Sequence, residues 1–355
     1  MTPFGRWALV ALAMLLVAAT PVAVAAWPTA DSDISAAALL DEMSAAEDHP
    51  WSGYVETRGV LELPVADDFA DVGALFSGRT RLRAWWRSAA DWRVDRLGTT
   101  GETDVVRHDR MTTEWDYESQ RARVSTDPSI RLPRAADLVP PVLAARVLGG
   151  VDAAQVSRVP ARRVAGIAAP GLRVRPEAPQ SSIDHVDLWA DPDSGVVLRV
   201  EVYGDGADAP SFTTELREFS AATPDPETTA FVPTEDTEVS YEPVLDIADA
   251  ANQFASVRPP SSVAGLARSP ASDRAVGVYG AGITELIAIP LRDQEAEPLR
   301  HQLGSTPGAR QITAGIVVTS GPLGVLLTGR CGDGGWLVTG TVTTGTLVDA
   351  AEDLP

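Results

Sequence analysis

The sequence predicts an α+β protein whose larger part is a curved antiparallel sheet, or open β half-barrel, with capping helices. Short strands of alternating polar and apolar residues follow one another between residues 79 and 125, with tight turns between them. An apolar helix at 138–148 interrupts this series before further strands resume. A stretch at 221–262, rich in Pro, Thr, Asp and Glu, then separates these strands from a second group, which predicts a smaller C-terminal α+β domain.

Residues 1–30 are typical of an export segment. Arg6 precedes an apolar run at 7–19, and Ala23-Val24-Ala25 offers the small residues of a signal-peptide cleavage site. Apolar character continues to Trp27 and so reaches the roughly 20 residues of a membrane span, which leaves an uncleaved signal anchor open. In either case we expect an exported protein of the cell envelope, secreted or anchored by this segment.

The first elements after this segment are a helix and a long strand. The pattern at 32–48 predicts the helix, with Ser32 or Asp33 as its N-cap. The strand at 51–63 alternates, and Val55 and Leu61 share its apolar face. The next strands are expected at 79–87, 92–96, 102–109, 112–118 and 122–125. Most of them read as one polar and one apolar face, as in an antiparallel sheet with one solvated side.

The helix at 138–148 suggests where a ligand would bind. Pro140 and Pro141 are tolerated because they fall in its first turn. The helix is apolar on most sides, which predicts that it lies buried against the concave face of the sheet. An interior helix over a curved sheet implies an apolar cavity, which suits lipid or acyl chains better than polar substrates.

A β-hairpin at 184–203 follows two further strands, at 157–167 and 172–175. Its turn, Asp191 to Gly195, contains Pro192 to preset φ and a glycine that accepts positive φ. Three acids here (Asp187, Asp191, Asp193) lack the spacing and the final Glu of a calcium loop, so we interpret them as part of a hairpin and not as a metal site. A strand at 211–220 completes the first domain.

Apolar and aromatic side chains of these strands are the candidates for the cavity wall. They are Val55, Leu61, Leu82, Trp86, Trp92, Val94, Trp115, Tyr117, Val186, Leu188, Leu198 and Val200. Tryptophan is also routine core packing in curved sheets, so a core role for the aromatic residues stays equally open.

The domain boundaries follow from composition. The half-barrel domain is expected at 31–235, a linker with a short helix at 236–262, and the small domain at 263–355. Apolar strands of the small domain are expected at 275–280, 285–290, 315–318, 324–328 and 336–342, before a terminal helix at 344–353.

Net charge excludes some classes of partner. The chain has a formal net charge of −20 at pH 7, and all 29 of its basic residues are arginine. Such an acidic chain is a poor candidate for binding nucleic acid or an anionic lipid surface. An arginine group is expected on the solvated convex side, paired with carboxylates: Arg79, Arg81, Arg83, Arg87, Arg93 and Arg96. Docking of an acidic or phosphate-bearing partner on that side is the alternative.

The sequence contains none of the common motifs of catalysis or cofactor binding. The sequence has no Walker loop, no G-x-S-x-G elbow, no H-E-x-x-H and no paired-cysteine metal site. Its four histidines are scattered singly, and Cys331 cannot form an internal disulfide. We therefore expect a protein that is not an enzyme and that has no catalytic residues, metal or cofactor. An exported hydrolase stays as an unfavoured alternative.

Three stretches resemble a known family. They are 51–55 (Trp-Ser-Gly-Tyr-Val), 186–200 and 336–347, the last followed by Ala350-Ala351. With the order of elements over 34–353, they resemble the LolA-like lipoprotein-carrier superfamily, and in particular the RseB/MucB sigma-E regulatory proteins. The resemblance implies a half-barrel that binds lipid or an acylated ligand, and a second domain that helps to hold a membrane anti-sigma factor. A lipid or lipoprotein carrier is the alternative function.

Overall fold

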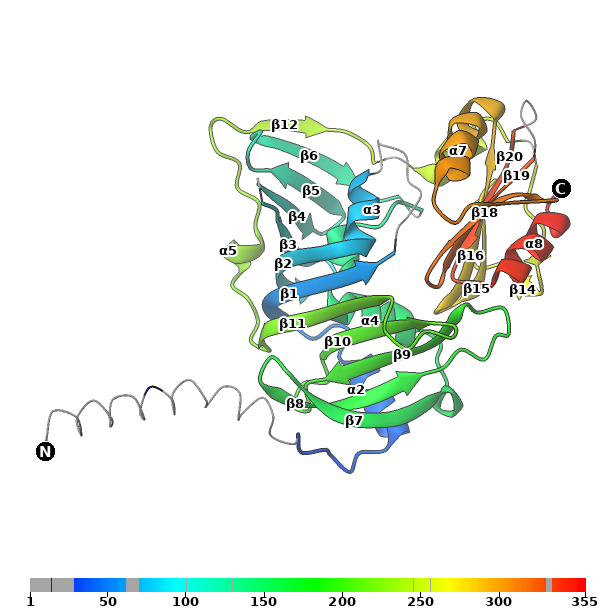
Figure 1. Cartoon of the computed structure of the whole chain (residues 1–355). Coiled ribbons are helices and arrows are strands. Elements are labelled where there is room, and N and C mark those ends of the chain that lie inside the picture. Colours follow the sequence, from blue (N-terminus) through cyan, green and yellow to red (C-terminus); the bar gives the residue numbers. More distant parts are fainter. Residues whose placement is uncertain are drawn as a thin grey trace, which may run out of the picture.

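The computed structural model describes residue 14 and residues 29–61, 70–99, 101–128, 130–244, 246–255, 257–329 and 334–355. Almost all of the predicted export segment, and Cys331, lie outside the described residues. The remainder contains a large sheet, a smaller sheet beside it, and helices against both (Figure 1). Within the described part of the chain, no helix combines the length and apolar character that a membrane crossing needs.

The large sheet has twelve strands in the order β12-β6-β5-β4-β3-β2-β1-β11-β10-β9-β8-β7. Its strands are β1 (Trp51–Val60), β2 (Ser77–Ser88), β3 (Asp91–Leu97), β4 (Glu102–His108), β5 (Met111–Asp116), β6 (Arg121–Thr126), β7 (Val156–Val164), β8 (Ile167–Val174), β9 (Ile183–Ala190), β10 (Val197–Gly204), β11 (Phe212–Ser220) and β12 (Glu238–Tyr241). All neighbours pair antiparallel except β12 and β6, which are parallel. The fold class predicted from the alternating strands is confirmed.

Strand β1 joins the two halves of this sheet. It pairs with β2 on one side and with β11 on the other, so that Val55 lies opposite both Leu82 and Leu216. Register shifts interrupt the ladder between β1 and β11 and the ladder between β7 and β8, the second of them around Pro160. Such bulges bend strands and increase twist, so they help the long sheet to curve.

Helices cover one face of the large sheet, which we call the inner face. They are α2 (Ala36–Ala45), α3 (Ala70–Phe76), a 3₁₀ turn η2 (Ala135–Leu138) and α4 (Pro140–Leu148). The Ser35 side chain caps α2 by accepting from the Ala38 N–H, and such a cap contributes about 1 kcal/mol. The proline-led helix was predicted correctly: Pro140 and Pro141 occupy its first turn, and Ala144 and Val147 are buried under it.

The opposite, outer face of the sheet is crossed by residues 221–241. Helix α5 (Pro226–Thr229) contacts β2 and β3, Phe231 packs edge-on against Trp115, and β12 then pairs with β6. The segment expected to be a linker thus contains a sheet strand, and also the short helix α6 (Ile247–Asn252). The boundaries at 235 and 262 stay a prediction.

The smaller sheet has the order β15-β16-β20-β19-β18-β17. Its strands are β15 (Gly277–Ala281), β16 (Thr284–Leu291), β17 (Arg310–Ile312), β18 (Gly315–Ser320), β19 (Leu323–Thr328) and β20 (Gly335–Gly340). Helices α7 (Asp293–Ser305) and α8 (Thr344–Asp353) lie on opposite faces, because Ile316 packs with α7 whereas the next residue, Val317, packs with α8. A two-stranded ribbon of β13 (Ser262–Val263) and β14 (Leu266–Ala267) precedes this sheet.

Main-chain hydrogen bonds join the two sheets. The Ser182 N–H donates to Thr341 O at 3.2 Å, and the Thr343 N–H donates to Gln180 O at 2.8 Å. Ser181 forms an isolated β-bridge with Val342 between these two bonds. Because the chain just before β9 pairs with the chain just after β20, the two sheets are docked as well as covalently linked.

Candidate ligand-binding site

Ten of the twelve predicted cavity residues are buried on or beside the inner face. Val55, Leu82, Trp86, Trp92, Val94 and Leu198 belong to one apolar cluster. Val186, Leu188 and Val200 belong to a second cluster. Leu61 follows β1 and is buried near Gly321, a residue of the smaller sheet's β18–β19 turn. The alternation of polar and apolar residues along the strands therefore predicted correctly that these ten side chains are buried.

The first inner-face cluster is packed with side chains of the protein itself. Ala135, Ala136, Leu138 and Val139, at the entry to α4, close over it. Trp51, Trp86 and Trp92 stack in a row, with ring centroids 6.2 Å apart for the first pair and 5.3 Å for the second. These tryptophans thus act as core in this structure, which is one of the two roles left open by the sequence.

Trp115 and Tyr117 lie on the outer face. Residues opposite one another in a ladder share a face, and Trp115 lies opposite Asp104, which in turn lies opposite Asp95. Because Asp95 alternates with the inner-face residue Val94, this row belongs to the outer face. Trp115 contacts Phe231 and Tyr117, and Tyr117 is 56% exposed. The structure therefore does not bring these two residues together with the other ten.

An open pocket lies between α2 and α4, with a volume of about 330 Å³. It is lined by the C-terminal end of α2, by α4 along its length, by the residues that follow each helix and by Val197 of β10. The lining residues are Met43, Ser44, Ala46, Glu47, Pro141, Ala144, Ala145, Leu148, Gly149, Gly150, Val151 and Val197. None of the twelve predicted residues is among them, although Val197 is the direct neighbour of Leu198 on β10.

The second inner-face cluster forms the layer under this pocket. Leu40 and Met43 of α2 pack with Ala144 and Leu148 of α4, and this cluster continues to Val200 in the sheet. The pocket is thus an opening in the helical cover of an apolar layer. Ser44 and Glu47 supply the polar side chains among its lining residues. The pocket therefore exposes polar groups as well as the small apolar side chains of the two helices.

Two buried hydroxyl groups lie deeper on the inner face. Thr57 and Thr214 are register partners on β1 and β11, and they are 1% and 0% exposed. Within the described residues, the Oγ1 atom of each has no hydrogen-bond partner. A buried hydroxyl without a partner costs about 1–3 kcal/mol, so these positions could accept a polar atom of a bound molecule.

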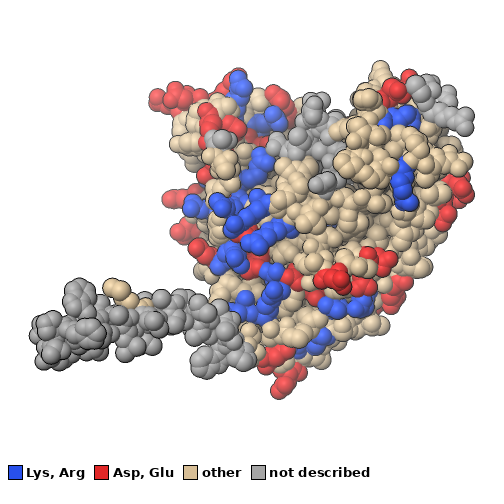
Figure 2. All heavy atoms as spheres, viewed as in Figure 1, with Lys and Arg blue, Asp and Glu red and all other residues tan. Residues whose placement is uncertain are grey.

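The outer face carries ladders of arginine and carboxylate side chains (Figure 2). The Arg173 guanidinium binds Asp187 with two hydrogen bonds of 2.6 and 2.7 Å. Glu56 pairs with both Arg58 and Arg79, and Arg199 bridges Glu201 to a second carboxylate. Of the six arginines predicted to pair on this side, Arg79, Arg87 and Arg93 form ion pairs with carboxylates.

Individual arginines depart from that prediction. Arg96 lies opposite Leu82 and so shares the inner-face alternation, because it follows Val94 by two residues. Arg81 and Arg83 are exposed and form no ion pair within the described part of the chain. Docking of an acidic partner on them stays a prediction.

Ion pairing lowers the pKa of several buried carboxyls. Burial would raise the pKa of Glu201, but hydrogen bonds from Arg199 and Tyr203 and the charge of Arg162 outweigh burial and lower it. For Asp137 the same opposition holds, since Arg131 binds its carboxylate with two hydrogen bonds of 2.7 and 2.8 Å. Asp137 also accepts from the Arg134 N–H, so this carboxylate fixes the entry to α4.

The hairpin turn at Asp191 is closed by the protein's own groups. The Asp191 carboxylate accepts from the Ser194 N–H at 3.0 Å and from the Ser194 hydroxyl at 2.6 Å. Gly195 has φ +75°, and its backbone packs against Glu42 of α2, where a Cβ would lie 2.6 Å from a carbonyl oxygen. The turn therefore anchors one wall of the pocket.

An antiparallel sheet with a helical cover, opened by a pocket between two helices, defines a scaffold suited to binding. Among solved structures the chain is similar to the complex of Pseudomonas aeruginosa MucA/MucB (18% identity, 89% of this chain and 96% of that chain, TM-score 0.49). It is also similar to MucB alone, with 17% identity over 89% of this chain and 95% of that chain and a TM-score of 0.45. A third similar structure is the LolA superfamily protein NE2245 from Nitrosomonas europaea, with 10% identity over 53% of this chain and 92% of that chain and a TM-score of 0.22. No protein-family model and no curated protein sequence matches the chain.

Proposed function

We propose that this chain is a non-catalytic, exported protein of the cell envelope that binds a lipid or acylated ligand and regulates an anti-sigma factor. The pocket between α2 and α4 is the observation that supports ligand binding. Its volume of about 330 Å³ lies at the lower end of the range of small-molecule sites, roughly 300–1,000 Å³. The partner in this proposal follows from the resemblance of the sequence to RseB/MucB regulators, and the solved MucB complexes contain MucA.

The two helices that form the pocket are suited to admit an acyl chain. Both present small side chains to the opening, among them Ala46, Ala144 and Ala145. Helix α4 begins at two prolines and ends at Gly149 and Gly150, the second with φ +76°. An acyl chain of a ligand that enters between the helices meets the apolar side chains of the second inner-face cluster, so burial of the acyl chain is favourable.

Filling the pocket with a large side chain tests ligand binding. Ala145→Trp is expected to weaken binding of a fluorescent fatty acid roughly tenfold or more, because the indole occupies the space between the helices. Arg146→Trp is the matched control, since Arg146 is exposed at the next position of α4 and does not line the pocket. Titration by fluorescence, with native mass spectrometry of the purified chain, measures both. Equal binding by the two variants would exclude this pocket as the site.

Crosslinking in cells separates the regulator from the carrier. A regulator is expected to crosslink to a membrane protein that has a cytoplasmic sigma-binding domain. A carrier is expected to move lipid between vesicles, which a donor–acceptor fluorescence assay detects. Lipid transfer without any such membrane partner would contradict the regulatory part of the proposal and leave ligand binding intact.

A further inference from the structure

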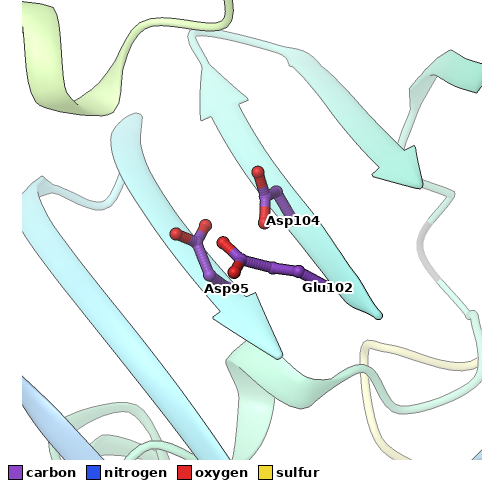
Figure 3. Close-up of side chains that lie close together, drawn as sticks. All are labelled: Asp95, Glu102 and Asp104. Carbon is purple, nitrogen blue, oxygen red and sulfur yellow. The ribbon is translucent and has the colours of Figure 1, made fainter. Parts of the chain in front are cut away.

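Three carboxylates meet on the outer face, far from the pocket of the proposed function. Asp95 on β3 and Asp104 on β4 are register partners, and Glu102 lies two residues before Asp104 on the same face. One oxygen of each carboxylate lies within 4.8 Å of an oxygen of the other two. Figure 3 shows the three side chains turned toward one another above the two strands.

This cluster differs from the ion pairs around it in its charge. Arg93 donates to Asp95 Oδ1 and to Asp104 Oδ2, each at 2.6 Å. Three carboxylates therefore share one guanidinium, which leaves two negative charges. Elsewhere on the outer face, by contrast, Asp187 has Arg173 to itself and Glu56 has two arginines.

Burial makes this excess charge costly. Asp95 is 2% exposed and Asp104 1% exposed. Asp104 Oδ1 is buried and, within the described residues, no group donates a hydrogen bond to it. Arg83 of β2 lies opposite Asp95 but is exposed and forms no ion pair within the described part of the chain.

We propose that Asp95, Glu102 and Asp104 bind a divalent cation, with calcium as the best fit. One such ion balances the two remaining negative charges and gives Asp104 Oδ1 a partner. Carboxylate oxygens are the ligands of hard cations, and calcium–oxygen distances of about 2.4 Å place opposed ligands roughly 4.8 Å apart. The three oxygens lie within that distance of one another, and calcium tolerates irregular coordination geometry better than magnesium, which requires a near-ideal octahedron. Glu102 is half-buried, so solvent reaches the site and supplies further ligands.

The ion would stabilise the outer half of the large sheet. It would link β3 to β4, which Arg93 of β3 already joins through its hydrogen bonds to Asp95 and Asp104. This role is independent of the pocket between α2 and α4, so the failure of one proposal leaves the other standing.

Calcium titration of the full chain, stripped with a chelator, tests the site. The wild type is expected to bind one calcium ion by calorimetry and to melt at a higher temperature when calcium is added. Asp104→Asn and Glu102→Gln are expected to weaken binding roughly tenfold or more. Glu102→Gln changes a half-buried residue at the start of β4, so it retains the fold should Asp104→Asn fail to fold. Asp193→Asn, which removes an exposed acid from the hairpin turn, is the control and is expected to bind as the wild type does.

Terbium luminescence locates the ion. Trp115 lies opposite Asp104 on the same face, so terbium bound at the cluster is expected to emit when tryptophan is excited, and calcium is expected to displace it. Trp115→Phe should lower this emission without weakening calcium binding. Absence of calcium binding, or binding that both Asp104→Asn and Glu102→Gln leave unchanged, would overturn the proposal. In particular, Asp104→Asn could melt at a higher temperature than the wild type and show no response to calcium. That result would show that a proton shared between the carboxylates, and not a cation, neutralises the cluster.

Discussion

Replacing Trp86 with alanine is expected to lower the free energy of unfolding by about 4–5 kcal/mol. Removal of a buried tryptophan costs about 3–5 kcal/mol through lost burial and the cavity left behind. Trp86 is also the middle ring of the stack, so its loss breaks the contacts with both Trp51 and Trp92. Each aromatic pair adds about 0.5–1.5 kcal/mol, and the whole loss is a large part of the roughly 5–15 kcal/mol of a typical domain.

Urea unfolding followed by circular dichroism measures this loss. Trp85→Ala is the matched control, because Trp85 is the next residue on β2 but lies on the outer face, half-buried beneath the Arg93 guanidinium at 5.8 Å. Its removal is expected to cost about 1 kcal/mol. Equal losses for the two variants would show that the inner-face stack has no special part in stability.

Replacing Arg199 with methionine is expected to cost about 3–5 kcal/mol at neutral pH. The side chain bridges Glu201 and Glu215, which are 5% and 13% exposed, and without it two largely buried carboxylates lose their principal partner. Removing one partner of a buried ion pair has this cost because the other charge stays desolvated. Arg217→Met is the control: Arg217 is 47% exposed and binds Glu215 alone, so less than about 1 kcal/mol is expected.

The pH dependence identifies the origin of that cost. Burial raises the pKa of Glu201, but Arg199 and the other partners outweigh burial, so the folded pKa lies below the unfolded value of about 4.3. The stabilisation is therefore present above about pH 4.3 and is lost as the pH falls through the folded pKa. Urea unfolding of the wild type and of Arg199→Met is thus expected to differ most near pH 7 and to converge below about pH 4. A constant difference would assign the loss to packing of the arginine stem.

Local sequence patterns predicted most strands, because alternation is a property of each strand alone. The face that a strand shares with its neighbours depends on register, which sequence alternation does not specify. Trp115 illustrates this: it was grouped with Trp92, but the ladder through Asp104 and Asp95 places it on the outer face. The same ladder brings the three carboxylates together. The signal available in the sequence was that Asp95 and Asp104 lie at similar distances from the connection between two predicted strands.

Elements that depend on tertiary contacts were missed. Helix α7 contains Pro298 in its interior, which normally ends a helix, yet Ala296 and Leu303 bury its apolar side against the smaller sheet. Strand β12 lies in a polar stretch and forms because its backbone pairs with β6. The pocket likewise arises where α2 and α4 meet, a geometry that neither helix sequence contains.

The outermost strands of the large sheet determine whether copies of this chain can join edge to edge. Free strand edges are templates for aggregation, and short, charged or proline-containing edges prevent it. Strand β12 has four residues and begins at Glu238. On the other rim, Pro160 interrupts β7, and Asp31 accepts from the Ala161 N–H and pairs with Arg158.

The cover on β7 lies immediately after the predicted export segment. Arg158 also donates to Ser32 O, so residues 31–34 lie along this rim. Cleavage after Ala25 would keep this cover, whereas trimming ten residues further, as far as Ser35, would remove it. If the predicted export segment is removed, the position of cleavage would therefore decide whether this edge strand stays covered or is free to pair with another copy of the chain.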